Sequence, residues 1–195
     1  TRSLSSAASD VYKRQATLGT RRSIKKDHQA AWLLRAISCI DLTTLSGDDT
    51  PGRVKRLCTK AIRPIRPDLT KALGINNLHV GAICVYHEMI ETAIAALGNS
   101  GIPVAAVSTG FPAGLSPLTT RLLEINESVL AGAKEIDIVI SRRHVLTQNW
   151  QELFNEVKAF RSACGEAHLK TILATGELGS LRNVARASMV CMMAG

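Results

Sequence analysis

The sequence of 195 residues contains no long uninterrupted apolar run and few aromatic side chains. Nothing in it approaches the roughly 18 consecutive apolar residues of a membrane span, and its beginning lacks the apolar segment of a secretory signal peptide. Aromatic residues make up only 4% of the chain, too few to interleave with basic residues on a nucleic-acid-binding face. We therefore expect a cytoplasmic protein that binds neither membranes nor nucleic acids.

The sequence lacks closely spaced cysteine pairs and the common metal and nucleotide motifs. The five cysteines are odd in number and never closer than 19 positions apart, which is typical of reduced thiols rather than of a disulfide framework or a zinc site. The five histidines form no HExxH pair, and neither GxGxxG nor GxxxxGK[ST] occurs. We therefore expect no metal and no cofactor.

Positive charge is concentrated near the beginning of the chain. Residues 1–26 contain 7 of the 24 Lys and Arg residues but only 1 of the 16 Asp and Glu residues, and the remainder is nearly balanced. The first fifteen residues are rich in Ser, Ala and charge and have little to bury, which predicts disorder. We assign residues 1–20 to a disordered tail that need not be native sequence, and residues 21–195 to one domain.

Beyond the tail, short apolar runs alternate with amphipathic stretches. Strands are predicted at 36–42, 80–86, 104–108, 135–140 and 169–174. Near-continuous apolar strands separated by helices are typical of a parallel sheet with crossover helices, so the fold class is α/β. Five such units after an N-terminal helix indicate an incomplete (β/α)8 TIM barrel. The alternative is a five-stranded doubly wound sheet.

Several helix starts carry capping signals. Thr50 and Ser116 each precede a proline, the arrangement of an N-cap followed by a first-turn proline. Ser23 is predicted to cap the first helix. Another helix is predicted over residues 150–160, where apolar residues recur at helical spacing, and a last one runs from Ser180 to the chain end.

Two charged residues lie inside predicted strands. Asp137 stands among branched apolar residues in EIDIVI, and burial is expected to raise its pKa toward the range useful for proton transfer. Lys170 stands in the next strand, where partial desolvation is expected to lower its pKa and free the amine. If both strand faces point into a barrel, the two side chains meet. The alternatives are a structural aspartate and a surface lysine.

Two further candidates belong to the first strands. Asp41 closes the first apolar segment in DLTTLSGDDT, where it is suited to bind a substrate hydroxyl, to pair with a lysine or to cap the loop. Cys84 lies within AICVYH, where core filling is the default and a reactive role is the alternative. The loop GFPAG, residues 110–114, is a weaker candidate for backbone contact with a ligand.

Five segments together resemble one enzyme family. DLTTLSGDDT, AICVY, GFPAG, EIDIVI and CGEAHLKTILATGEL are similar, in order, to the animal-type 2-deoxyribose-5-phosphate aldolases. The resemblance implies a (β/α)8 barrel and a metal-free class I aldolase of deoxyribonucleotide catabolism. Such an enzyme splits 2-deoxy-D-ribose 5-phosphate into D-glyceraldehyde 3-phosphate and acetaldehyde through a lysine Schiff base. It also implies Asp137 as the proton-relay aspartate, Lys170 as the lysine beside it, and Asp41 and Cys84 as substrate-binding residues.

The chain also departs from the family pattern. The family's Schiff-base lysine follows the motif that here reads MMAG, where the sequence stops, and His87 replaces the proline usual after the second-strand tyrosine. We therefore expect a C-terminally truncated fragment, inactive alone, from an enzyme whose partner is a small phosphorylated sugar; a homo-oligomer is left open. The alternatives are a small doubly wound lyase that uses Lys170 as its nucleophile, and a non-catalytic scaffold.

Overall fold

The computed structural model describes residues 13–21 and 23–195. Most of the predicted disordered tail, residues 1–12, lies outside the described residues. The described part of that tail includes a short 3-10 helix, η1 (Leu18–Thr20), whose side chains are exposed. This helix contributes no buried residue to the domain.

In the described part of the chain, parallel strands form one five-stranded sheet in the order in which they occur in the sequence. The strands are β1 (Asp41–Thr43), β2 (Ala82–Val85), β3 (Val104–Ser108), β4 (Glu135–Val139) and β5 (His168–Ile172). The longer helices that follow them are α3 (Pro51–Ile62), α5 (Ile90–Leu97), α6 (Leu118–Leu130), α8 (Trp150–Ala163) and α9 (Leu181–Ala194). The remaining helices are α2 (Lys26–Ile37), α4 (Pro67–Ala72), η2 (His87–Met89), α7 (Arg142–Leu146) and η3 (Thr175–Glu177).

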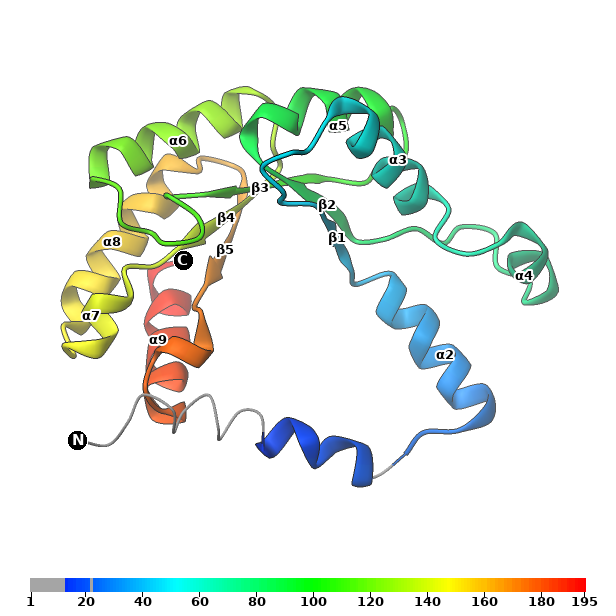
Figure 1. Cartoon of the computed structure of the whole chain (residues 1–195), viewed down its shortest axis with the longest axis horizontal. Coiled ribbons are helices and arrows are strands. Elements are labelled where there is room, and N and C mark those ends of the chain that lie inside the picture. Colours follow the sequence, from blue (N-terminus) through cyan, green and yellow to red (C-terminus); the bar gives the residue numbers. More distant parts are fainter. Residues whose placement is uncertain (1–12, 22) are drawn as a thin grey trace.

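The strand order decides between the two predicted architectures. Figure 1 shows the strands in an arc, with α3, α5, α6 and α8 along its outer side. A doubly wound sheet reverses its strand order at a switch point and carries helices on both faces. The sequential order with helices on one side is that of a partial barrel, so the doubly wound alternative is wrong.

The pleat of the strands sorts their side chains onto two faces. On the face under the helices lies the main core, which includes the fully buried Ile83 and Ile138. On the opposite, inner face lies a smaller buried cluster of Cys84, Ala105 and Val107. The core therefore holds the helices to the sheet, and the inner face is left to smaller and polar side chains.

Two predicted helix starts are confirmed. At the start of α3, the Thr50 hydroxyl accepts a hydrogen bond from the Arg53 backbone N–H at 3.3 Å. At the start of α9, Ser180 accepts one from the Asn183 N–H at 3.2 Å. Each bond satisfies an N–H that has no partner within the helix. The helix predicted over 150–160 is α8.

Three predicted boundaries are wrong. Helix α2 begins after Lys25, which makes no side-chain cap, so Ser23 does not cap it. The N-cap of α6 is Pro117 itself, one residue later than the predicted Ser116. The strand predicted at 36–42 begins inside α2, which ends at Ile37. The observed strand β1 starts only at Asp41 and is three residues long. A short apolar run fits the end of a helix as well as a strand, and here the first part of the run ends the helix while residues 38–40 form the turn before β1.

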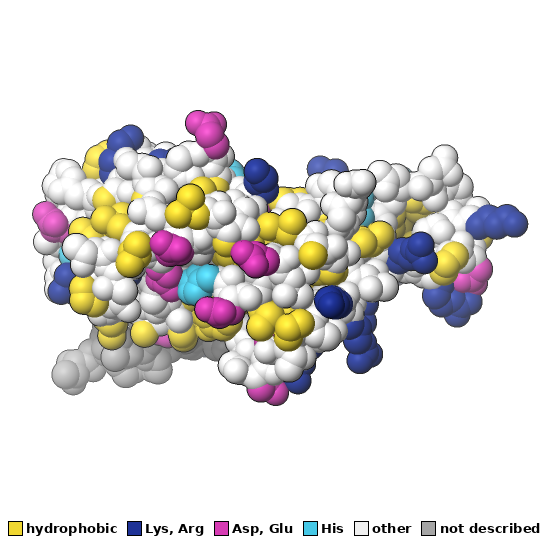
Figure 2. Space-filling view, turned by 90° about the horizontal axis from the view of Figure 1, so that it is seen from above, with side chains coloured by type: hydrophobic (Ala, Val, Ile, Leu, Met, Phe, Trp, Pro, Cys, Tyr) yellow, Lys and Arg dark blue, Asp and Glu magenta, His cyan; other side chains and the backbone are white. Residues whose placement is uncertain are grey.

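Basic side chains gather at one end of the molecule. Figure 2 shows Lys and Arg toward the end that carries α4, while acidic side chains lie over the other half of the same face. The exposed basic residues of α3, α4 and the turn between them are Arg53, Lys55, Arg56, Lys60, Arg63, Arg66 and Lys71. Although basic and acidic residues are nearly balanced in number after residue 26, they are therefore unevenly distributed over the surface.

Candidate active site

Lys170 lies at the centre of a charged cluster on the inner face of the sheet. In the β4–β5 pairing Asp137 is the register partner of Lys170, so both side chains project from the same face. Lys170 Nζ lies 3.1 Å from Asp137 Oδ1 and 2.9 Å from Glu135 Oε2. It also donates a hydrogen bond to Asp41 Oδ2. The predicted meeting of the acid and the amine is confirmed.

Asp41 reaches this cluster from the far edge of the sheet. Strands β1 and β5 are the two edge strands, yet Asp41 of β1 and Lys170 of β5 form an ion pair. A contact between opposite edges requires the sheet to curve back on itself, as it does in a barrel. The arc visible in Figure 1 thus brings together side chains that a flat sheet would hold apart.

Asp137 is the most buried carboxyl group of the cluster, with 15% of its side chain exposed against 38% for Asp41 and 21% for Glu135. Burial raises the pKa of Asp137, and the positive charge of Lys170 lessens that rise. Its Oδ2 accepts a hydrogen bond from Cys84 Sγ at 3.7 Å. Its buried Oδ1 receives no well-aligned hydrogen bond from the described residues. The predicted direction of the pKa is confirmed, and Oδ1 keeps a free lone pair.

The predicted lowering of the Lys170 pKa is wrong. Burial does oppose the ammonium form, but the hydrogen bonds to Asp41 and Glu135 and the charge of Asp137 outweigh it and raise the pKa of Lys170 above its ordinary value. The apolar neighbours of Lys170 on its own strand indicate only the effect of burial, whereas its carboxylate partners lie on other strands. At neutral pH Lys170 is therefore an ammonium group without the lone pair that attack on a carbonyl requires.

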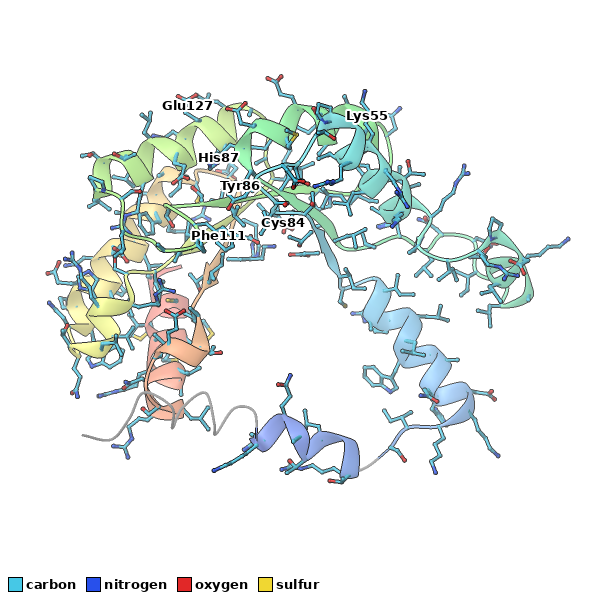
Figure 3. All side chains as sticks on the ribbon, viewed as in Figure 1. Lys55, Cys84, Tyr86, His87, Phe111 and Glu127 are labelled. Atoms are coloured by element: carbon cyan, nitrogen blue, oxygen red, sulfur yellow. The ribbon has the colours of Figure 1, made fainter. Side chains whose placement is uncertain are left out.

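An apolar wall, formed by Cys84, Tyr86, Val107 and Phe111, borders the charged cluster. The rings of Tyr86 and Phe111 meet edge to face with their centroids 6.0 Å apart. Cys84 is 3% exposed, and burial together with the charge of Asp137 raises its pKa to about 12. A thiol with that pKa is not a nucleophile at neutral pH, so core filling accounts for Cys84 better than reactivity does. Figure 3 shows Tyr86 and Phe111 beside Cys84.

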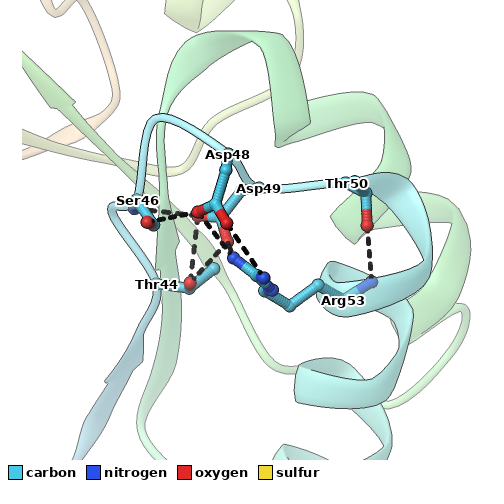
Figure 4. A network of polar contacts seen from close by, with 6 residues as sticks. All are labelled: Thr44, Ser46, Asp48, Asp49, Thr50 and Arg53. Atoms are coloured by element: carbon cyan, nitrogen blue, oxygen red, sulfur yellow. Dashed lines mark hydrogen bonds and ion pairs between the residues drawn. The ribbon is translucent and has the colours of Figure 1, made fainter.

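The loop between β1 and α3 is fixed by a network of polar contacts (Figure 4). Thr44 Oγ1 donates to both carboxyl oxygens of Asp49 at 2.9 Å, and the Ser46 N–H donates to the same carboxylate at 3.0 Å. Arg53 pairs with Asp48 at 2.8 Å and with Asp49 at 3.3 Å. Burial opposes ionisation of Asp49, but these hydrogen bonds outweigh it and lower its pKa. The network thus fixes the loop that follows β1, the strand that carries Asp41.

Some residues near the site were missed or given no role by sequence reasoning. Alternation put Glu135 on the face of Asp137, but its contact with Lys170 was not expected. Arg142 donates to the Ala113 carbonyl at 2.9 Å and pairs with Glu177 at 2.9 Å, so it joins the loops that follow β3 and β5. No local pattern marks such contacts, because the partners lie on separate loops.

Residues 13–21 and 23–195 contain no group of three or more His, Cys, Asp or Glu side chains arranged to hold a metal ion. No described helix combines the length and apolar character needed to cross a membrane.

The fold and the site together define a barrel-type α/β protein with a lysine and carboxylates on the inner face of its sheet. A model of the DeoC/LacD family aldolases matches residues 35–195, and the chain belongs to this family. It is 57% identical over 189 residues to a deoxyribose-phosphate aldolase of Bos taurus and 58% identical over 189 residues to one of Mus musculus. Each match covers 95% of this chain and 59% of the relative, so the chain spans less than two thirds of these relatives.

Solved structures support the fold. A putative deoxyribose-phosphate aldolase from Coccidioides immitis superposes with a TM-score of 0.70 at 21% identity, covering 99% of this chain and 70% of that one. Another from Toxoplasma gondii ME49 gives a TM-score of 0.67 at 20% identity, covering 86% of this chain and 59% of that one. At these identities the likeness concerns the arrangement of the strands and helices, and it agrees with the partial barrel.

Proposed function

We propose that the protein containing this chain is a class I deoxyribose-phosphate aldolase that cleaves 2-deoxy-D-ribose 5-phosphate to D-glyceraldehyde 3-phosphate and acetaldehyde. The observation that carries the proposal is the contact between the buried carboxyl group of Asp137 and the ammonium group of Lys170, 3.1 Å apart. Identity to the bovine and murine aldolases over 95% of the chain supports the substrate. We also propose a cytoplasmic location, since the cysteines within the described residues are free.

Cleavage through a Schiff base requires proton transfer in both directions. An amine condenses with the C1 carbonyl of the sugar and releases water. A base then takes the proton of the C3 hydroxyl while the C2–C3 bond breaks, and the electron pair of that bond forms an enamine. The enamine is protonated at C2 before water releases acetaldehyde. The reaction therefore needs a group that accepts and returns a proton near neutral pH.

Asp137 has the properties of that group. Burial raises its pKa, so its carboxyl group binds a proton more readily than an exposed aspartate does. Its Oδ1 is buried without a well-aligned hydrogen bond from the described residues, so the protein leaves part of its capacity to accept a proton unused. Lys170 lies beside the same oxygen as a positive charge and a proton donor. The pair thus supports transfer of a proton to and from the bound sugar.

We assign the nucleophilic amine to a lysine other than Lys170. Its carboxylate partners hold Lys170 as an ammonium group, which disfavours the alternative in which Lys170 forms the Schiff base. The carboxylates of the cluster outnumber this ammonium group, and their excess negative charge stabilises a second cation placed beside it, such as an iminium. The family resemblance assigns that lysine to the strand after MMAG.

An assay of the complete gene product that contains this chain tests the proposal. Cleavage of deoxyribose 5-phosphate is followed by coupling the released triose phosphate to the oxidation of NADH. We expect turnover by the unsubstituted protein, loss of turnover in Lys170→Met, and unchanged turnover in Lys55→Met, because Lys55 is exposed on α3. A folded protein without turnover would refute the proposal and favour the non-catalytic scaffold.

A further inference from the structure

The loop that joins β3 to α6 carries one side of the apolar wall. Phe111 belongs to this loop, and its ring packs against the buried cluster that contains Cys84 and Val107. Tyr86, at the end of β2, meets Phe111 from the other side. The position of the loop therefore sets how much room the apolar wall leaves beside the charged cluster.

A side chain of α6 binds the backbone at the first turn of this loop. The Gly110 backbone N–H donates to Glu124 Oε2 at 2.8 Å. Gly110 has a φ of +75°, and a Cβ at this position would lie 2.9 Å from Ser116 Oγ, so the turn is tight and needs glycine. The buried Thr109 fixes the residue before it, since its hydroxyl donates to the Val139 carbonyl at 3.0 Å and accepts from the Val139 N–H at 2.6 Å.

Glu124 is in turn held by His87. His87 Nε2 lies 3.1 Å from Glu124 Oε1, the oxygen that does not bind Gly110. Burial opposes ionisation of Glu124, but the hydrogen bonds from His87 and from the Gly110 N–H outweigh it and lower its pKa. The glutamate thus links the residue that follows Tyr86 to the loop that carries Phe111.

The hydrogen bonds of the histidine ring define its role further. His87 Nδ1 lies 3.1 Å from Ser128 Oγ, and that hydroxyl already donates its proton to the Glu124 carbonyl at 2.9 Å. Each ring nitrogen thus faces one partner, Ser128 on α6 and the Glu124 carboxylate, and the two contacts together fix the orientation of the ring.

We propose that His87 and Glu124 are positioning residues that hold Gly110, and with it Phe111, against Tyr86, and so set the size of the aldehyde that the site accepts. This inference rests on the proposed aldolase function. His87 and Glu124 lie outside the charged cluster and act through the loop. Figure 3 shows His87 next to Tyr86, with Phe111 beside them and Glu127 on α6.

The test compares three variants of the complete gene product. His87→Leu and Glu124→Ala remove the two links, and Glu127→Ala is the matched control on an exposed position of the same helix. The rate of backbone hydrogen exchange of residues 109–116 measures how firmly the loop is fixed. The preference for the smaller aldehyde is measured as the ratio of kcat/KM for acetaldehyde to kcat/KM for propanal, each added to glyceraldehyde 3-phosphate.

We expect exchange of residues 109–116 to rise about tenfold in both link variants, as for the loss of one hydrogen bond. We expect their preference for acetaldehyde to fall roughly threefold or more, since discrimination of one methylene is small. Glu127→Ala should change neither value. His87→Gln should recover part of both losses, because its amide N–H can replace Nε2 as the donor to Glu124.

Two results would overturn the inference. One is unchanged exchange of residues 109–116 in His87→Leu and Glu124→Ala. The other is faster exchange with an unchanged preference between the two aldehydes. If the unsubstituted protein shows no aldolase activity, the proposed function fails, and the exchange measurement alone then decides whether His87 and Glu124 hold the loop.

Discussion

Replacing Asp137 by asparagine removes a charge from the site while keeping the shape of the side chain. The amide cannot accept the proton of a substrate hydroxyl, so we expect turnover of the complete gene product to fall by a factor on the order of 10² or more, about 2.7 kcal/mol in activation free energy. Glu127→Gln makes the same chemical change on an exposed position of α6 and should leave turnover unchanged.

The same substitution should cost little stability. Asp137 is 15% exposed, and its partner Lys170 keeps the carboxylates of Asp41 and Glu135 when Asp137 is replaced. No unpaired buried charge is created, so we expect the free energy of unfolding at pH 7 to change by less than about 1 kcal/mol. Loss of several kcal/mol would assign Asp137 to structure.

The pH dependence provides an independent check of the Asp137 environment. Because folding raises the pKa of Asp137 above 3.8, the folded state binds a proton more tightly than the unfolded state does. The stability that this carboxyl group contributes is present below pH 3.8 and is lost as the pH rises through the folded-state pKa. Urea unfolding should therefore show that the free energy of unfolding of Asp137→Asn, relative to that of the unsubstituted protein, is higher at pH 7 than at pH 4. Normal turnover in the variant, or the opposite pH trend, would refute this reasoning.

Three other substitutions or treatments have defined outcomes. Lys170→Met leaves its carboxylate partners facing one another, so urea unfolding at pH 7 should show a loss of about 1 to 3 kcal/mol in the free energy of unfolding. The loss should shrink near pH 3.5, where carboxylates become protonated, and an equal loss at both pH values would contradict this. Arg121→Met leaves the buried Glu156, 2.8 Å away, without its cation, which should cost about 3 to 5 kcal/mol, and a second change, Glu156→Met, should restore part of that stability. Iodoacetamide at pH 8 should label the exposed Cys39 and not Cys84, as read by mass spectrometry of the folded protein; rapid labelling of Cys84 would contradict its burial and raised pKa.

The contact between Asp137 and Lys170 could be predicted from the sequence, because it depends only on the alternation of side chains along a strand and on the pairing of consecutive strands. Asp137 and Lys170 occupy equivalent positions on consecutive strands, and parallel pairing puts such residues side by side. The ionisation of Lys170 could not be predicted in this way. It depends on Asp41, which reaches Lys170 only because the curved sheet brings its two edges together.

Boundaries and loop contacts were the less predictable part of the fold. The apolar run at 36–40 is compatible with a helix end or a strand, and in the structure α2 ends at Ile37 and β1 begins only at Asp41. The link from His87 to Glu124 joins two elements whose sequences contain no pattern that pairs them. The four predicted site residues lie together in the structure, and their roles in catalysis stay predictions.

We propose that Lys170 acts as a charged partner of Asp137 beside a separate nucleophilic lysine. The most direct test is borohydride reduction of the complete gene product in the presence of acetaldehyde, followed by peptide mapping of the modified lysine. Borohydride converts an iminium into a stable secondary amine, so the label marks the residue that forms the Schiff base. We predict a label on a lysine other than Lys170, whereas a label on Lys170 would show that Lys170 itself forms the Schiff base.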